Sequence, residues 1–149
     1  VSVAALAGVL AAGAGAAVQA SSHGESADQK VEVRKDVMAG IGGDMAVLVG
    51  VAKGEVGFDD KVVKRTLRGM KYLTHASKEA FEDKAEGAMV ETTATDAVWN
   101  EWDKFTGGLD MQAEKIDAVM AAVGTDGYGP AVQELGKVCK DCHDNFRDK

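Results

Sequence analysis

The sequence predicts an all-α fold, an antiparallel up-and-down bundle of four helices. Apolar residues recur at intervals of three and four along four segments, and no segment shows the alternation of a strand. The 149 residues include one proline, so little interrupts long helices. Modest loops between amphipathic helices favour antiparallel neighbours. The formal charge of −7, without a cluster of Lys and Arg, argues against nucleic acid as a partner.

The first 20 residues differ from the rest of the chain. Residues 1–20 carry no charge, and Val18-Gln19-Ala20 has the small residues typical of the position before a signal-peptidase cut. The segment is also just long enough to span a bilayer, so an uncleaved membrane anchor remains an alternative to a signal peptide. Both alternatives predict export. Residues 21–29 are polar and predict a connector, which leaves residues 30–149 as the bundle domain.

The first two predicted helices cover about residues 29–53 and residues 59–84. The first is ended by Gly54 and Gly57, and its apolar stripe is Val33, Val37, Ile41, Met45, Leu48 and Ala52. Asp59 suits the N-cap of the second helix. The stripe of the second helix includes two small polar residues and runs Val63, Leu67, Met70, Thr74, Ser77 and Phe81.

The third and fourth predicted helices follow a polar connection, residues 86–95. The third starts at Thr95 or Asp96 and ends before Gly124, with a buried side of Val98, Trp102, Phe105, Leu109, Ile116, Val119 and Val123. Two adjacent glycines, 107 and 108, weaken it by up to about 1 kcal/mol each. After a turn at 125–129, Pro130 suits the first position of the fourth helix. The stripe of that helix is Val132, Leu135, Cys139, Cys142 and Phe146.

Cys139, Cys142 and His143 form the motif C-x-x-C-H on the last predicted helix. This pattern is typical of covalent attachment of haem c, in which two thiols bond the macrocycle and the imidazole binds the iron. At about 100° per residue, the three side chains face one side of a helix. Arg147 lies one turn further and is a candidate haem contact, although a solvated arginine near the chain end explains it equally well.

Other uses of the two cysteines fit the sequence less well. A thioredoxin-like C-x-x-C follows a strand, and none is predicted here. A structural zinc site normally needs four ligands, and His23 or His75 would have to join the motif to supply the fourth. A disulfide between cysteines three residues apart closes a tiny loop and stabilises little. A small zinc-stabilised interaction domain is the remaining alternative without haem.

The segment from Gly136 to Arg147 and the first helix, from Val33 to Glu55, resemble class II cytochromes c, the family that includes cytochrome c′. The resemblance covers about residues 30–149. It implies a four-helix bundle with one covalently attached haem c, a periplasmic location and, as often in this family, a homodimer through the first two helices.

Members of that family differ at the sixth iron position. The resemblance implies that Met38 binds the iron opposite His143 in a low-spin protein, or packs over an open face that binds gases such as nitric oxide. Met45, two turns further, is the backup ligand. The run from Gly42 to Glu55 and the chain end are most similar to the low-spin members.

The expected function is therefore that of a periplasmic carrier of single electrons with His143 and Met38 as axial ligands, and a five-coordinate gas-binding protein is the alternative. No nucleophile, acid–base pair or phosphate loop predicts an enzyme. Redox proteins, including membrane complexes, are the expected partners, and a retained segment 1–20 would tether the haem near such complexes.

Overall fold

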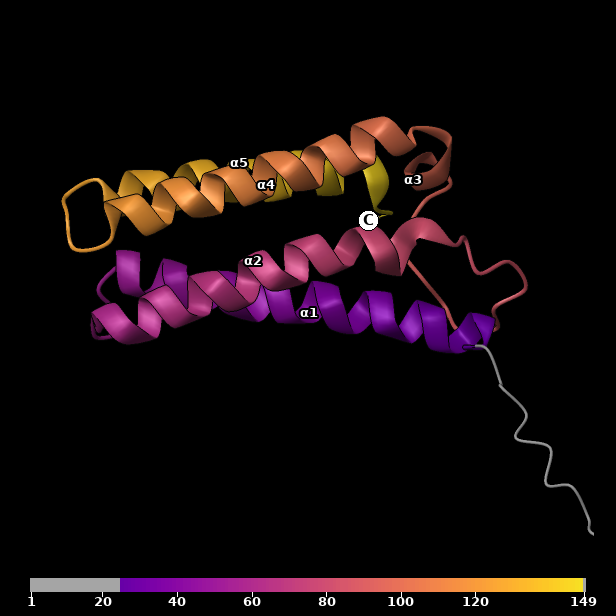
Figure 1. Ribbon diagram of the computed structural model, residues 1–149, viewed down its shortest axis with the longest axis horizontal. Helices are drawn as coiled ribbons and strands as arrows, with labels where there is room; N and C mark the ends of the chain where they lie inside the picture. Colours follow the sequence, from indigo (N-terminus) through magenta and orange to yellow (C-terminus); the bar gives the residue numbers. More distant parts are fainter. Residues whose placement is uncertain (1–24, 149) are drawn as a thin grey trace, which may run out of the picture.

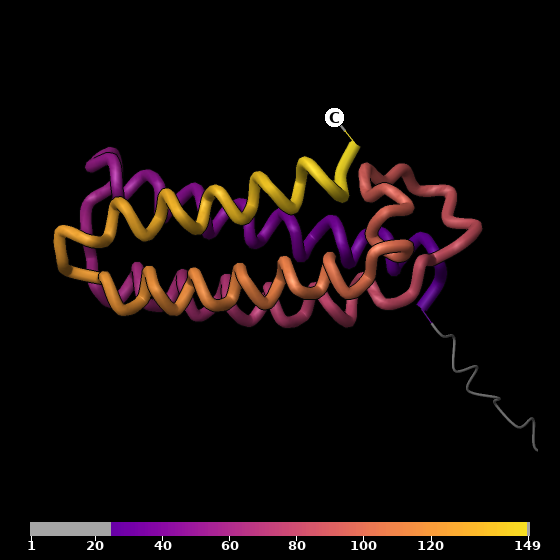
Figure 2. The backbone as a smooth tube through the Cα atoms, turned by 90° about the horizontal axis from the view of Figure 1, so that it is seen from above, coloured from indigo at the N-terminus to yellow at the C-terminus, as the bar shows by residue number. Residues whose placement is uncertain are grey.

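The computed structural model describes residues 25–148. Helices α1 (Ala27–Ala52), α2 (Asp60–Glu82), α4 (Trp102–Ala122) and α5 (Tyr128–Phe146) form a four-helix bundle, and the short α3 (Ala97–Asn100) leads into α4. In Figure 1, α1 and α2 form one layer and α4 and α5 the other. The connection after α2 and the C-terminus lie at the same end of the bundle (Figure 2). The predicted fold is confirmed.

The N-terminal signal or anchor segment, residues 1–20, lies outside the described residues. Within residues 25–148, no helix has the length and apolar character needed to cross a membrane.

Helix α1 begins earlier than the sequence predicted. Ser26 is the N-cap and forms a capping box with Gln29: the Gln29 backbone N–H donates to Ser26 Oγ at 3.2 Å, and the Ser26 N–H donates to Gln29 Oε1 at 2.8 Å. These reciprocal bonds satisfy donors that a helix start leaves unpaired. Residues 27–29 therefore belong to the helix and not to the polar connector.

The buried face of α1 also differs from the predicted stripe. Val33 is 39% exposed, whereas Val31 and Arg34 are 1% and 2% exposed. The face that turns inward follows alternate steps of three and four through residues 31, 34, 38, 41, 45 and 48, and Val33 lies off this line. The prediction was wrong at this position because an arginine was not expected in the interior.

Helix α2 matches its prediction closely. Asp59 is the N-cap, and its Oδ1 accepts from the Val62 N–H at 2.9 Å. All six residues of the predicted stripe are buried, including the small polar pair Thr74 and Ser77. The hydroxyl groups of this pair donate to backbone carbonyls of the preceding turn, at 2.8 Å and 2.9 Å, which explains how they tolerate burial.

The third predicted helix is divided into α3 and α4. Glu101, with φ −120° and ψ 43°, leaves the helical region between them, whereas α4 continues through Gly107 and Gly108. Val98 of α3 and Phe105 of α4 nevertheless belong to the same core cluster. Helix α5 starts at Tyr128, so Pro130 is its third residue and not its first.

Two clusters of buried residues fill the bundle. The main cluster joins α1, α2, α4 and α5 around Ile41, Leu67 and Leu135. The second lies near the C-terminus and consists of Phe81, Val98, Phe105, Leu109 and Phe146. In the second cluster, the Phe105 ring lies 5.1 Å from Phe81 and 5.4 Å from Phe146, measured between centroids.

Candidate haem-binding site

A cavity of about 570 Å³ lies among α1, α4 and α5 at the end of the bundle that holds the second cluster. Its lining includes all five site residues that the sequence predicted: Met38, Cys139, Cys142, His143 and Arg147. The structure therefore brings residues more than 100 positions apart to one cavity.

Helix α5 carries the two cysteines on the cavity wall. Both are free thiols of intermediate exposure, and Cys142 packs against the phenylalanine cluster. Burial raises the pKa of both thiols, that of Cys142 to about 11, where the nearby Cys139 and Asp141 add to the effect. At neutral pH the chain alone holds both groups as thiols, unlike the acidic thiolate of a dithiol oxidoreductase.

His143 follows Cys142 directly, and its side chain lines the same cavity although the residue as a whole is exposed. Partial desolvation of the ring lowers its pKa, Arg147 lowers it further, and Asp144 acts in the opposite direction. A lowered pKa favours neutral imidazole, which is the form that binds a metal.

The zinc alternative finds no ligand set in the described part of the chain. Within residues 25–148, no group of three or more His, Cys, Asp and Glu side chains converges as a metal site. His75, one of the two candidates for a fourth ligand, is exposed on α2, and His23 lies outside the described residues.

Helix α1 contributes two methionines to the cavity that the motif of α5 also lines. Met38 is partly buried, lines the cavity and packs against both core clusters. Met45, the backup ligand, also lines the cavity and packs against the main cluster. Whether either sulfur binds iron remains a prediction.

Gln112 is a cavity residue that the sequence did not predict. It is 7% exposed, and its Nε2 donates to Thr74 Oγ1 at 3.0 Å. The Thr74 hydroxyl donates in turn to the Met70 carbonyl at 2.8 Å, which fixes the direction of the chain of bonds. A gap in the apolar stripe of the third helix, between Leu109 and Ile116, was the signal that could have identified it.

A strap formed by residues 91–94 borders the cavity beside the end of α5. The Asp148 N–H donates to the Thr93 carbonyl at 2.8 Å, and the Thr95 N–H donates to the Phe146 carbonyl at 2.9 Å. These bonds fasten the connection between α2 and α3 to the segment directly after the C-x-x-C-H motif.

The residues around the cavity fit a haem held by α5. Two thiols and an imidazole lie on one wall, mostly apolar side chains form the others, and the volume is in the usual range for cofactor pockets. A smaller cavity between α1 and α5 is lined, among the described residues, by no cysteine or histidine.

A family model described as Cytochrome C′ matches residues 29–147. The chain belongs to the cytochrome c′ family. It is thus a c-type cytochrome that carries covalently attached haem c. The relatives include cytochrome c-556 from Agrobacterium fabrum, which is 33% identical over 80% of this chain and 82% of the relative. Cytochrome c′ from Rubrivivax gelatinosus is 30% identical over 80% of this chain and 94% of the relative.

Solved structures of the cytochrome c′ family share the fold of this member. Cytochrome c′ from Rubrivivax gelatinosus matches with a TM-score of 0.72 and 27% identity, over 83% of this chain and 98% of that structure. A nitric oxide complex of a mutant cytochrome c prime from Alcaligenes xylosoxidans matches with a TM-score of 0.71 and 22% identity, over the same shares of the two chains. The second likeness concerns the fold alone.

Proposed function

We propose that this cytochrome binds nitric oxide or another small gas at a haem iron whose sixth position is open. When bound, the haem supplies an iron that accepts one small ligand and exchanges single electrons. In this proposal Cys139 and Cys142 hold the haem, and His143 is the ligand on the α5 side. The observation that carries the proposal is the apolar part of the α1 lining, from Met38 to Met45, where Met38 packs against both core clusters.

The chain's own residues give this site its selectivity. The apolar side chains that the second cluster and the middle of α1 contribute to the cavity favour small uncharged ligands. Partial desolvation and Arg147 lower the pKa of His143, which favours the neutral ring that can bind the iron. Likeness to the cytochrome c′ of Rubrivivax gelatinosus, at 30% identity, supports the gas-binding assignment.

The second candidate is a low-spin electron carrier in which Met38 binds the iron. It is favoured by one observation, that the Met38 thioether and the His143 imidazole line the same cavity from α1 and α5. A thioether ligand raises the reduction potential of haem, and two protein ligands would exclude gases. Relatives named cytochrome c-556 are as similar to this chain as those named cytochrome c′.

A visible spectrum of the purified holoprotein separates the two candidates. We expect a broad high-spin ferrous spectrum and rapid binding of carbon monoxide and nitric oxide. Met38→Ala should leave that spectrum high-spin, because the Met38 side chain only packs in this proposal. Sharp α and β bands in the wild type that become broad in Met38→Ala would refute the proposal and establish Met38 as a ligand. Met120→Ala, which removes a partly buried methionine away from the cavity, is the matched control.

The remaining expectations concern location and assembly. We propose a periplasmic protein that forms a homodimer, as the family resemblance implies. The mass of the mature protein will show whether residues 1–20 are retained as a tether. Its sedimentation coefficient will show whether two copies associate.

A further inference from the structure

A second, smaller cavity of about 220 Å³ lies between α1 and α5 beside the haem cavity. Its inner lining is apolar or glycine: Met45, Val49, Gly129, Val132 and Gly136. The remaining three residues, Ala52, Lys53 and Gln133, are exposed, so the cavity opens to solvent on their side. Its size and lining suit a small apolar molecule and offer little to a charged one.

Met45 is the one described residue that lines both cavities. The tip of its side chain lies close to α5, because a Cβ atom placed on Gly136 would be 3.3 Å from Met45 Cε. The glycine therefore leaves the space that the Met45 tip occupies. Methionine has an unbranched side chain with three rotatable bonds, so it can change rotamer at small cost. One flexible type of side chain thus lies between the two cavities.

We propose that the small cavity is an entry site for the diatomic ligand, and that Met45 is the gate between it and the haem cavity. The proposal rests on the proposed gas-binding function. A cavity of about 570 Å³ matches one large cofactor and leaves little room for a second molecule to pass it. The small cavity offers a ligand a separate path to the α1 side, one that ends at Met45.

Xenon tests the entry site directly, because it occupies apolar cavities without chemical bonds. Crystals of the holoprotein under xenon pressure should show a xenon atom against Val49 and Val132. Xenon found only elsewhere in the protein would overturn the assignment of the small cavity. This readout does not depend on the state of the iron.

Flash photolysis of the ferrous carbon monoxide complex tests the gate. Met45→Ala should raise the association and dissociation rates together, by about tenfold if the gate contributes about 1.4 kcal/mol to the barrier, and leave the affinity unchanged. Gly136→Ala should lower both rates, because its Cβ restricts the Met45 tip. Met120→Ala is the control, since Met120 packs against the main cluster but lines neither cavity.

Equal rates in wild type, Met45→Ala and Gly136→Ala would refute the gate. A changed affinity without matching changes in both rates would place Met45 in contact with the bound ligand and also refute it. If the wild-type iron proves six-coordinate, the same comparison is made in the Met38→Ala background, where the sixth position is open. A six-coordinate wild type overturns the gas-binding function, whereas rates independent of Met45 in that background overturn the gate.

Discussion

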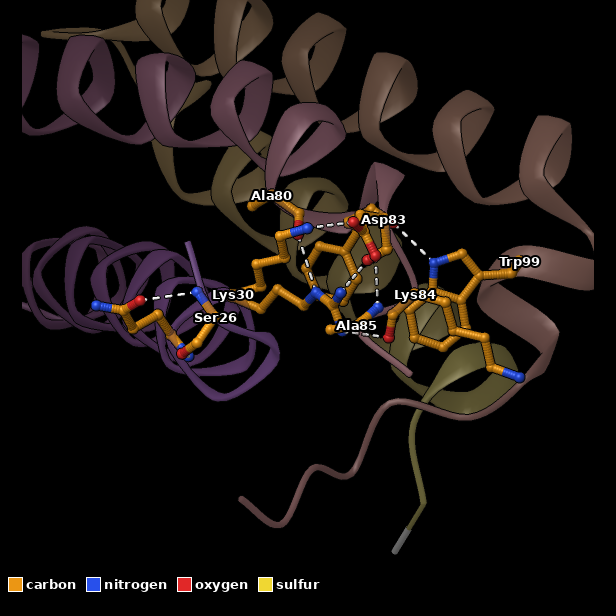
Figure 3. Close-up of polar contacts among 10 residues, drawn as sticks. Ser26, Lys30, Ala80, Asp83, Lys84, Ala85 and Trp99 are labelled. Carbon is orange, nitrogen blue, oxygen red and sulfur yellow. Dashed lines mark hydrogen bonds and ion pairs between the residues drawn. The ribbon is translucent and has the colours of Figure 1, made fainter. Parts of the chain in front are cut away.

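Replacing Arg34 with methionine tests how the C-terminal end of α2 is held beside the haem cavity. The Arg34 side chain comes from α1 and is 2% exposed. Its Nε donates to the Ala80 carbonyl at 2.9 Å, Nη2 donates to the Asp83 carbonyl, and Nη1 lies 3.4 Å from the Lys84 carbonyl. Figure 3 shows these acceptors grouped around one position, with Trp99 beside them. The last carbonyls of a helix lack donors within the helix, so Arg34 acts as a cap.

The contacts of Arg34 set the size of the expected effect. A hydrogen bond from a charged donor contributes about 1.5–3 kcal/mol, and the bond from Nε to the Ala80 carbonyl, at 2.9 Å, has the ordinary length of one. The guanidinium also lies 5.4 Å from the ring centroid of Phe81 and 5.2 Å from that of Trp99, contacts of about 1 kcal/mol. Burial lowers the pKa of Arg34, which indicates a desolvation cost that offsets part of this gain. We expect Arg34→Met to lower the free energy of unfolding by about 3 kcal/mol.

Urea unfolding of the holoprotein, followed by circular dichroism, measures this loss. The control is Lys35→Met, because Lys35 is the neighbouring cation and its ion pair with Glu32, at 3.0 Å, is exposed on both sides. That variant should lose less than about 0.5 kcal/mol. Arg34→Lys should lose an intermediate amount, since one ammonium cannot reproduce the fork of the guanidinium. A loss below about 1 kcal/mol for Arg34→Met, or an equal loss in the Lys35 variant, would refute the capping role.

Two further predictions concern carboxylates on α1. Burial raises the pKa of Asp44, so the ionised carboxylate destabilises the fold above that pKa. Asp44→Asn should therefore raise the melting temperature at pH 7. It should leave the melting temperature unchanged near pH 3, where the aspartic acid and the asparagine are both neutral. Thermal melts at the two pH values check this, and an equal shift at both would contradict it. Asp28 Oδ1 accepts from the N–H groups of Met89 and Val90 at 2.5 Å and 3.1 Å, so Asp28→Ala should speed amide exchange at these two residues. Unchanged exchange there would show that the loop is held by other contacts.

The sequence predicted correctly those parts of the fold that depend only on the residues of a single helix. The α2 stripe from Val63 to Phe81 is buried as predicted, because each of its polar members bonds to its own helix. Arg34 was missed because its burial depends on carbonyl groups 46 to 50 residues away. Gln112 was missed for the same reason, since its partner Thr74 lies on another helix.

The candidate site divides in the same way. Cys139, Cys142 and His143 are predictable because their chemistry needs only adjacent positions on one helix. The strap at residues 91–94 could not be predicted from periodicity, because tertiary bonds to the end of α5 hold it in place. Periodicity did not predict the break at Glu101 either. Met38 combines both situations. The sequence predicts that it is a candidate ligand, but its role depends on where α1 lies relative to α5.

The position of α1 relative to α5 therefore links the fold to the function. Arg34 and Met38 lie one turn apart on this helix and line the same cavity. Arg34 fastens that turn to the end of α2, and Met38 packs against both clusters, so contacts other than a bond to iron already determine where the thioether lies. Because these contacts act on the whole of α1, a substitution elsewhere on the helix, such as Arg34→Met, can move the thioether without any change at Met38 itself. The same methionine is therefore compatible with both a gas-binding and an electron-carrying cytochrome.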